Sequence, residues 1–274
     1  MNPLATIYWD LSPELIQLGP ITIRWYGVLF ALAFFIGYYI IRWIFRREKK
    51  PEGDPGTLLL YILGGTLIGA RLGHCFFYEP EYFLSRPVEI IKIWQGGLAS
   101  HGAALGILAA LYFYTRKRPG QPFLWLLDRL VIPTALGGAL IRLGNLFNSE
   151  IIGTPCRLPW AFVFPRMTGG DLLPRHPVML YEGVAYGVIF ILLLVIYRRQ
   201  GSRIPRGELS GLFFVTVFSA RFIIEYLKTR QAAYQLPIPL NVGQLLSIPA
   251  IMLGVLLLIW SLTRERTSGT KEIK

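Results

Sequence analysis

The sequence has few of the residues that build disulfide frameworks or metal centres. Two cysteines, Cys75 and Cys156, are too few for a disulfide framework, and we favour two free thiols over one pair. Three histidines are present, and none follows the His-x-x-x-His or Glu-x-x-His spacing of a metal site. We therefore expect no metal ion and no cofactor.

Other familiar signals are also missing. The sequence has no Gly-x-Ser-x-Gly elbow and no phosphate-binding loop that ends in Gly-Lys-Ser/Thr. The first residues contain Asp10 and Glu14 but no Lys or Arg, so the basic start of a cleavable signal peptide is missing. No repeat or inverted symmetry is evident, which argues against a transporter built from duplicated halves.

Long apolar runs are abundant. The chain of 274 residues is 53% hydrophobic, with a mean hydropathy of +0.47. About 20 apolar residues suffice to cross a bilayer. Charge-free runs extend over 25–41 and 236–263, and a third, 93–115, is interrupted only by His101. Several such runs joined by short loops predict a single integral membrane domain over residues 1–274.

The runs predict an all-α bundle of about seven transmembrane helices. Segments rich in Pro and Gly, such as 51–56 and 119–122, separate them. The predicted helices cover residues 21–44, 57–78, 96–115, 123–143, 178–197, 209–227 and 242–262.

Glycines at four-residue spacing recur in three of these helices. Such spacing allows helix backbones to approach closely, and we interpret most of these glycines as packing positions. The series are Gly65, Gly69 and Gly73, then Gly102 and Gly106, then Gly183 and Gly187.

The distribution of Lys and Arg predicts the orientation in the membrane. The segments after the first, third, fifth and seventh helices hold more than twice as many basic residues as those on the opposite side. Because cytoplasmic loops are enriched in basic residues, we expect the N-terminus outside and the C-terminus in the cytoplasm. The net charge of +12 then belongs to the loops rather than to a nucleic-acid-binding face.

Five arginines are predicted to lie within the apolar helices or at their edges. A charge at the helix centre costs about 2.5–3.5 kcal/mol on insertion scales, so such residues need a partner, water or an anionic ligand. We expect the side chains of Arg24 and of Arg129, with Asp128, to extend to the membrane interface. The other three arginines are Arg71, Arg142 and Arg221.

Two of these arginines have candidate neighbours on their own helix. Arg221 and Glu225 are four residues apart, and we expect them to pair. Arg71 and His74 share one helix face, where a structural hydrogen bond and a functional role are equally open.

Arg142 opens a polar string, Arg142-Leu-Gly-Asn145-Leu-Phe-Asn148-Ser149-Glu150-Ile-Ile-Gly153. Helical spacing predicts Arg142, Asn145 and Ser149 on one face. A guanidinium there can bind a phosphate through two parallel hydrogen bonds, with Glu150 orienting it. A salt-bridged helix end is the open alternative.

His101 lies close to glycines that let the backbone approach a ligand. Histidine is the side chain best suited to move a proton near neutral pH, although a lone intramembrane histidine often serves as a hydrogen bond between helices. Several cations and one candidate base inside a membrane protein suit an anionic lipid head group, and they do not by themselves name a reaction.

The polar string from Arg142 to Gly153 resembles the signature of the prolipoprotein diacylglyceryl transferases. The chain departs from that signature at Ile141 and Leu146, where the family usually has Gly and Phe, and its outer loop is short. Further matching stretches occur in the family's order along nearly the whole chain. They are Trp25-Tyr26-Gly27, Gly69-Ala-Arg71-Leu-Gly73, Trp94-Gln-Gly-Gly97, Ser100-His101-Gly102, Pro174-Arg-His-Pro177, Leu180-Tyr181-Glu182, Ala220-Arg221-Phe-Ile-Ile-Glu225 and Gly243-Gln244-Leu-Leu-Ser-Ile-Pro249.

The resemblance implies an enzyme of the bacterial plasma (inner) membrane with its active site toward the outer side. It would transfer the diacylglyceryl group of phosphatidylglycerol to the lipobox cysteine of a prolipoprotein, forming a thioether and releasing glycerol phosphate. His101 matches the family's essential histidine and is the proposed general base. Arg142 and Arg221 match its arginines and would stabilise the departing phosphate.

The resemblance also implies roles for four further residues. Tyr26 would hydrogen-bond the head group or the thiol, Asn145 and Glu150 would hold Arg142, and Gly153 would admit the lipid. The expected partners are phosphatidylglycerol and prolipoprotein signal peptides, with no nucleic acid, and we expect a monomer. Open alternatives are another phospholipid-dependent transferase, a membrane transporter and a non-catalytic lipid-binding protein.

Overall fold

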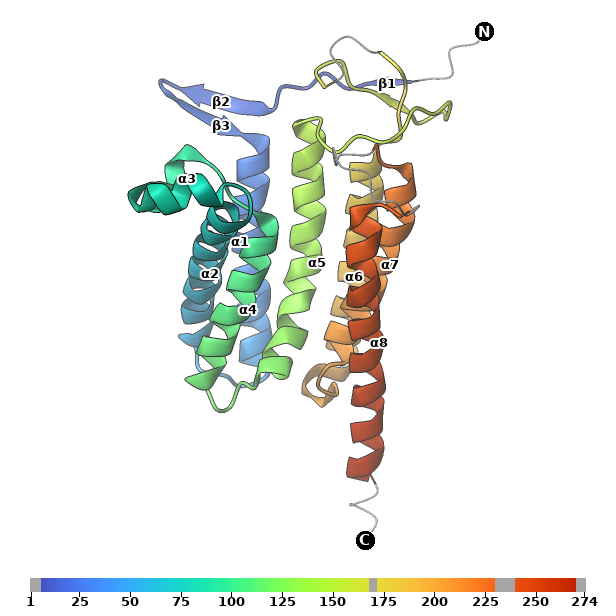
Figure 1. Ribbon diagram of the computed structural model, residues 1–274. Coiled ribbons are helices and arrows are strands. Elements are labelled where there is room, and N and C mark those ends of the chain that lie inside the picture. The colour runs from blue at the N-terminus through green and yellow to red at the C-terminus, as the bar shows by residue number, and fades with distance from the viewer. Residues whose placement is uncertain (1–5, 168–171, 230–239, 270–274) are drawn as a thin grey trace. The chain divides into compact units, whose positions relative to one another are not determined.

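The computed structural model describes residues 6–167, 172–229 and 240–269 (Figure 1). The start of the run at Leu236 and residues 168–171 of the outer loop lie outside these ranges. Six of the described helices are long and apolar enough to cross a membrane, which confirms the predicted helical membrane bundle. They are α1 (Trp25–Arg47), α2 (Asp54–Phe77), α5 (Phe123–Phe147), α6 (Val178–Gln200), α7 (Glu208–Ile224) and α8 (Val242–Gly269).

The remaining predicted span corresponds to α4 (Ser100–Arg116), which has 17 residues and is not among these six. The observed helices otherwise follow the predicted ranges within a few residues. There are two exceptions. Residues 21–24 form a strand rather than the first turn of α1, and α8 extends to Gly269 rather than ending at residue 262.

Short strands were missed by the sequence analysis. β2 (Glu14–Leu18) and β3 (Ile21–Arg24) form an antiparallel hairpin, and Gly19 supplies the positive φ of +60° at its turn. β1 (Ile7–Tyr8) pairs in parallel with β4 (Phe162–Val163). Arg24 is exposed and lies in β3 rather than in α1.

The chain divides into two compact units, residues 41–127 and residues 1–40 with 128–274. The first is called the arginine-71 unit and the second the arginine-142 unit.

In the arginine-71 unit, α2 and α4 pack backbone against backbone through their glycines (Figure 1). A Cβ atom added to Gly69 would collide with the backbone of Gly102 and Gly106, and one added to Gly73 would lie 2.6 Å from the Gly102 Cα. The packing interpretation of the first two glycine series is therefore confirmed.

Arg71 forms hydrogen bonds with the segment between α2 and α4. This segment contains α3 (Pro80–Ser85), η1 (Pro87–Ile91) and η2 (Ile93–Gln95). Its guanidinium is buried and donates to the main-chain oxygens of Glu89 at 2.6 Å, Ile90 at 2.9 Å and Gly96 at 2.5 Å. These contacts favour the structural role over the functional one for Arg71.

The start of α2 is tied to the loop that follows α4. Arg118 Nε donates to Asp54 Oδ1 at 2.9 Å, and this hydrogen bond raises the pKa of Arg118. Gln121 donates to the other carboxylate oxygen and accepts from the Tyr114 hydroxyl at 2.8 Å. The buried carboxylate of Asp54 is thereby satisfied on both oxygens.

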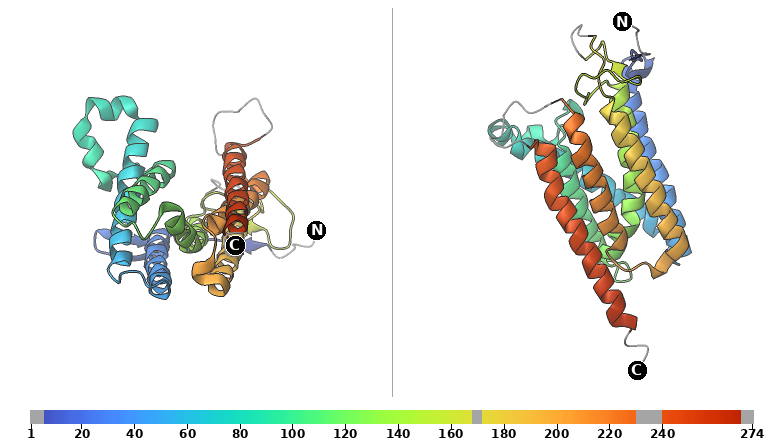
Figure 2. Two further views of the ribbon diagram at one scale, coloured as in Figure 1. Left: turned by 90° about the horizontal axis from the view of Figure 1, so that it is seen from below. Right: turned by 90° about the vertical axis from the view of Figure 1, so that its right-hand side faces the viewer.

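In the arginine-142 unit, α7 lies beside both α6 and α8 (Figure 2). Asp128 on α5 accepts hydrogen bonds from Gly207 N at 2.7 Å and Ser210 N at 2.8 Å, which caps the start of α7. Asp128 is fully buried and Arg129 is 1% exposed. The expectation that both extend to the interface is therefore wrong, because the carboxylate is needed at a helix start inside the protein.

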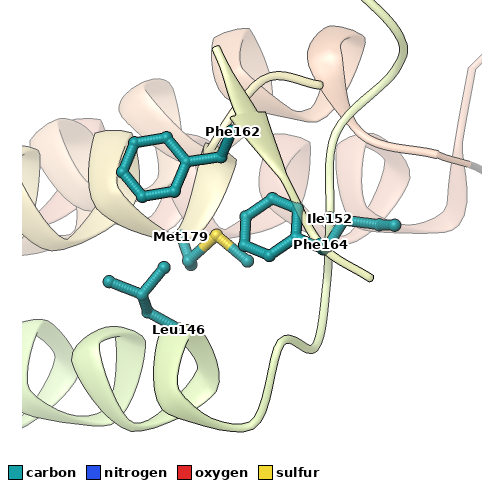
Figure 3. Packing of buried hydrophobic residues seen from close by; sticks show 5 residues of the cluster. All are labelled: Leu146, Ile152, Phe162, Phe164 and Met179. Atoms are coloured by element: carbon teal, nitrogen blue, oxygen red, sulfur yellow. The ribbon is translucent and has the colours of Figure 1, made fainter. Parts of the chain in front are cut away.

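An apolar cluster joins the end of α5, the segment between α5 and α6, and the start of α6 in this unit (Figure 3). Trp9 packs against it and donates from its indole to the Leu146 oxygen at 2.9 Å. The cluster fixes the chain that leaves α5, which is the segment that carries the polar string. Its members are Leu146, Ile152, Phe162, Phe164 and Met179.

Candidate functional site

Arg142 lies in the last turns of α5, one turn before Asn145. Its Nη1 donates to Asn145 Oδ1 at 3.0 Å. Residues three apart on a helix are surface neighbours, so the spacing alone brings this pair together. The predicted shared face is confirmed for these two residues.

Glu150 comes back toward this pair because the chain turns sharply after α5. The helix ends at Phe147, and Ser149 and Ile151 both have positive φ angles of 54° and 59°. Ser149 therefore lies beyond the helix rather than on the face of Arg142. Glu150 accepts from Asn145 Nδ2 at 3.1 Å and from Asn148 Nδ2 at 2.9 Å. It acts on Arg142 through Asn145.

The carboxylate that meets Arg142 directly comes from Glu182, in the second turn of α6. Glu182 Oε2 forms an ion pair with Arg142 Nε at 2.7 Å, with the N–H not aligned for a hydrogen bond. The Glu182 side chain has no exposed surface. From the sequence, Glu182 was noted only within the stretch Leu180-Tyr181-Glu182, although a carboxylate in an apolar helix itself indicates that a cation must lie nearby.

Lys228 is the second cation of Glu182. It follows η4 (Glu225–Leu227), and its Nζ lies 2.9 Å from Glu182 Oε1 and 2.9 Å from Glu225 Oε2. The prediction that Glu225 pairs with Arg221 is therefore wrong. α7 gives way to the tighter η4 after Ile224, which places the residue three positions later beside Glu225.

Arg221 lies in the last turn of α7. Its Nε is buried without a hydrogen-bond partner, and across the described residues no carboxylate lies within ion-pair distance of its guanidinium. Tyr186, one turn after Glu182, lies in electrostatic range of both Arg142 and Arg221.

Tyr26 joins this cluster from the first turn of α1. Its ring packs on Gly144, where an added Cβ would lie 2.8 Å from Tyr26 Cδ2. Its hydroxyl lies in electrostatic range of Glu150 and Arg142. A predicted site residue from a distant part of the sequence is therefore placed beside the polar string.

Gly153 lies between two other segments of backbone. Its N–H donates to the His176 oxygen at 3.0 Å, and an added Cβ would lie 2.5 Å from that oxygen and 2.8 Å from the Leu227 oxygen. The next residue, Thr154, donates from its N–H to the Leu227 oxygen at 2.8 Å. Only glycine fits here, and the reason is the close approach of three chain segments.

His101 belongs to the arginine-71 unit, where it is the second residue of α4. Its side chain is exposed, and none of the described residues forms a hydrogen bond or ion pair with its ring. The neighbouring Gly102 packs against α2. Packing against α2 thus fixes the start of α4, which carries His101.

The other two histidines have partners. His74 Nε2 lies 3.8 Å from Glu79 Oε1, and His176 Nδ1 lies 3.3 Å from the Tyr181 hydroxyl. Over residues 6–167, 172–229 and 240–269, no group of three or more His, Cys, Asp or Glu is placed to hold a metal ion.

Known proteins resemble this chain over almost all of its length. The model of the prolipoprotein diacylglyceryl transferase family matches residues 13–260. A phosphatidylglycerol–prolipoprotein diacylglyceryl transferase of Chloroherpeton thalassium is 56% identical over 98% of this chain and 100% of its own. Enzymes of the same name from Tolumonas auensis and Porphyromonas gingivalis are 51% and 42% identical, each over 93% of this chain and over 97% and 94% of their own. On the strength of these matches, the chain belongs to the prolipoprotein diacylglyceryl transferase family.

Proposed function

We propose that this protein transfers the diacylglyceryl group of phosphatidylglycerol to the lipobox cysteine thiol of prolipoproteins. The names of its relatives state both substrates. The observation that carries the proposal is that two arginines in apolar helices keep donors for an anion: Arg221 Nε is buried without a hydrogen-bond partner, and Arg142 is held through Nε and Nη1 only.

The two arginines have donors to offer a phosphate. A guanidinium has five N–H groups in a planar fork that matches phosphate oxygens. In Arg142, Nε contacts Glu182 and Nη1 donates to Asn145. Its Nη2 remains for Tyr186 or a ligand. Arg221 has an unpartnered Nε. A phosphodiester bound between the two arginines would accept hydrogen bonds from these N–H groups. Without an acceptor, a buried N–H group costs free energy.

The transfer is a displacement at carbon. The cysteine thiol gives its proton to His101. The thiolate sulfur then attacks the carbon of the diacylglyceryl group that is bonded to the phosphate oxygen. The sulfur–carbon bond forms as the carbon–oxygen bond breaks, and the electron pair stays on the phosphate oxygen of glycerol phosphate. Because the leaving phosphate gains negative charge, Arg142 and Arg221 stabilise it more strongly than the bound diester.

The remaining predicted residues support this site. Tyr26 hydrogen-bonds the head group or the thiol, and Asn145, backed by Glu150, fixes Arg142. Gly153 holds the outer loop against the segments of His176 and Leu227 so that lipid can enter beside the polar string.

The membrane arrangement belongs to the same proposal. α4 completes seven spans of one membrane domain in a monomer of the bacterial inner membrane. The N-terminus lies outside, the C-terminus lies in the cytoplasm, and the site opens to the outer side. Basic residues at the ends of α1, α4, α6 and α8 and in the segments that follow them support this orientation.

The test is a transfer assay with the full-length purified protein. Phosphatidylglycerol and a lipobox peptide are incubated with it, and the peptide mass is followed for a diacylglyceryl adduct. We expect the adduct with the cysteine peptide, none with a peptide in which serine replaces that cysteine, and a strong decrease for His101→Ala. No adduct from folded wild-type protein, or an adduct that forms equally without the thiol, would overturn the proposal.

A further inference from the structure

We propose that Glu182 is a positioning residue for the phosphate site, and that Lys228 is the counter-cation that allows it to be one. The carboxylate holds the Arg142 guanidinium in the orientation that receives the phospholipid phosphate. The inference rests on the proposed function, and it concerns two residues that the sequence analysis assigned to no role.

The first argument is the burial of Glu182. Its side chain is 0% exposed in an apolar helix, and its two oxygens meet two cations, Arg142 at 2.7 Å and Lys228 at 2.9 Å. Removing one partner of a buried ion pair leaves an uncompensated charge, which is strongly unfavourable. A carboxylate kept in this position therefore restrains both cations strongly.

The second argument is the geometry at Arg142. Glu182 faces its Nε, and Asn145 accepts from its Nη1. An ion pair at one nitrogen and a hydrogen bond at another restrain the guanidinium, and they leave the Nη2 edge free of these contacts. The α6 backbone lies next to Arg142 here, since an added Cβ at Gly183 would make ordinary van der Waals contact with the Arg142 Cβ at 3.5 Å. A rigid fork of this kind binds phosphate without first losing side-chain freedom.

The third argument is the place of Lys228. Its side chain joins Glu182 on α6 to Glu225 on η4, and its backbone pairs with Gly153. By taking Oε1, Lys228 leaves only Oε2 for Arg142, so Glu182 holds the arginine through one oxygen and cannot cover both of its donor edges. The arginine is oriented and keeps donors for a ligand.

The experiment measures transfer kinetics for Glu182→Gln, which keeps the shape and removes the charge. We expect kcat/KM for phosphatidylglycerol to fall by about 30- to 100-fold, as for other residues that orient a ligand-binding side chain. Glu182→Asp keeps the charge but is one methylene too short to reach both cations, and we expect a loss of about tenfold. The Asp variant decides the question if the Gln variant does not fold.

A double-variant cycle separates positioning from general stability. If Glu182 acts through Arg142, Glu182→Gln adds no further loss of kcat/KM in the Arg142→Ala background. Asp128→Asn is the matched control, because it also neutralises a fully buried carboxylate of the same unit. We expect it to lower thermal stability and to leave kcat/KM per folded molecule near the wild-type value.

Each outcome decides one proposal. A folded wild-type protein without transfer overturns the proposed function. Transfer by the wild type together with wild-type kcat/KM for both Glu182 variants overturns this inference alone. The inference is also overturned if Glu182→Gln lowers kcat/KM by the same factor in the wild-type protein and in Arg142→Ala. The glutamate would then act independently of the arginine.

Discussion

Arg71 and Arg142 each lie in an apolar helix, one in each unit, and the two arginines bind different kinds of acceptor. Arg71 donates to main-chain oxygens of the 89–97 segment. Arg142 meets the side chains of Glu182 and Asn145 and keeps a donor edge. Main-chain acceptors use the donors to shape the fold, whereas a pair of side-chain anchors orients a cation that still has donors for a ligand.

The largest difference is expected between substitutions of these two arginines in the transfer assay. Arg142→Ala removes a donor that stabilises the leaving phosphate, so we expect kcat to fall on the order of 10³-fold. The purified variant should remain folded by size-exclusion chromatography. Transfer within a few-fold of the wild type would contradict the role of Arg142 and with it the contrast between the units.

Arg71→Ala should affect stability instead. Loss of the guanidinium leaves the partly buried carbonyl oxygens that it binds without their donor, and we expect the free energy of unfolding to fall by about 3 kcal/mol. Chemical denaturation in detergent measures this, and transfer per folded molecule should stay near the wild-type value. A stable Arg71→Ala protein that has lost transfer would instead move Arg71 into the reaction.

The glycine contact between α2 and α4 tests how rigid the arginine-71 unit is. Gly69→Ala forces a Cβ into the backbone of Gly102, and we expect a loss of about 2 kcal/mol from overpacking. Gly64→Ala on the same helix is the control, since an added Cβ there meets nothing within 4 Å. Equal thermal midpoints for the two variants would show that the helices are not held at this distance.

The smallest effect is expected for the cap of α7. Asp128→Asn keeps an acceptor but loses the charge at the helix start, and we expect a loss of about 1 kcal/mol. The measurement is again denaturation, with transfer per folded molecule as the second readout. A selective rise in KM for phosphatidylglycerol would contradict a purely structural role of Asp128. Asp128 would then no longer differ from Glu182 in its effect on the substrate.

The sequence predicted the parts of this structure that depend on local spacing. Apolar runs gave the positions of the helices, the four-residue glycine spacing gave the contact of α2 with α4, and the interval from Arg142 to Asn145 gave their hydrogen bond. Each of these follows from helix geometry alone.

The missed features depend on which elements meet in space. Glu182 and Lys228 are 46 positions apart, and Asp128 caps a helix that begins 80 residues later. The pairing of Glu225 was mistaken because the helical register was extended through Glu225, where the chain tightens into η4. Local periodicity does not contain this information, although the presence of unpaired charges in apolar helices signalled that partners exist.

The most direct test of the account is equilibrium binding of phosphatidylglycerol to the detergent-solubilised protein, compared with binding of the corresponding diacylglycerol. The wild type should prefer the anionic lipid, and Arg142→Ala should lose that preference while it binds diacylglycerol unchanged. If the variant binds both lipids as the wild type does, Arg142 does not hold the phosphate and the account is wrong.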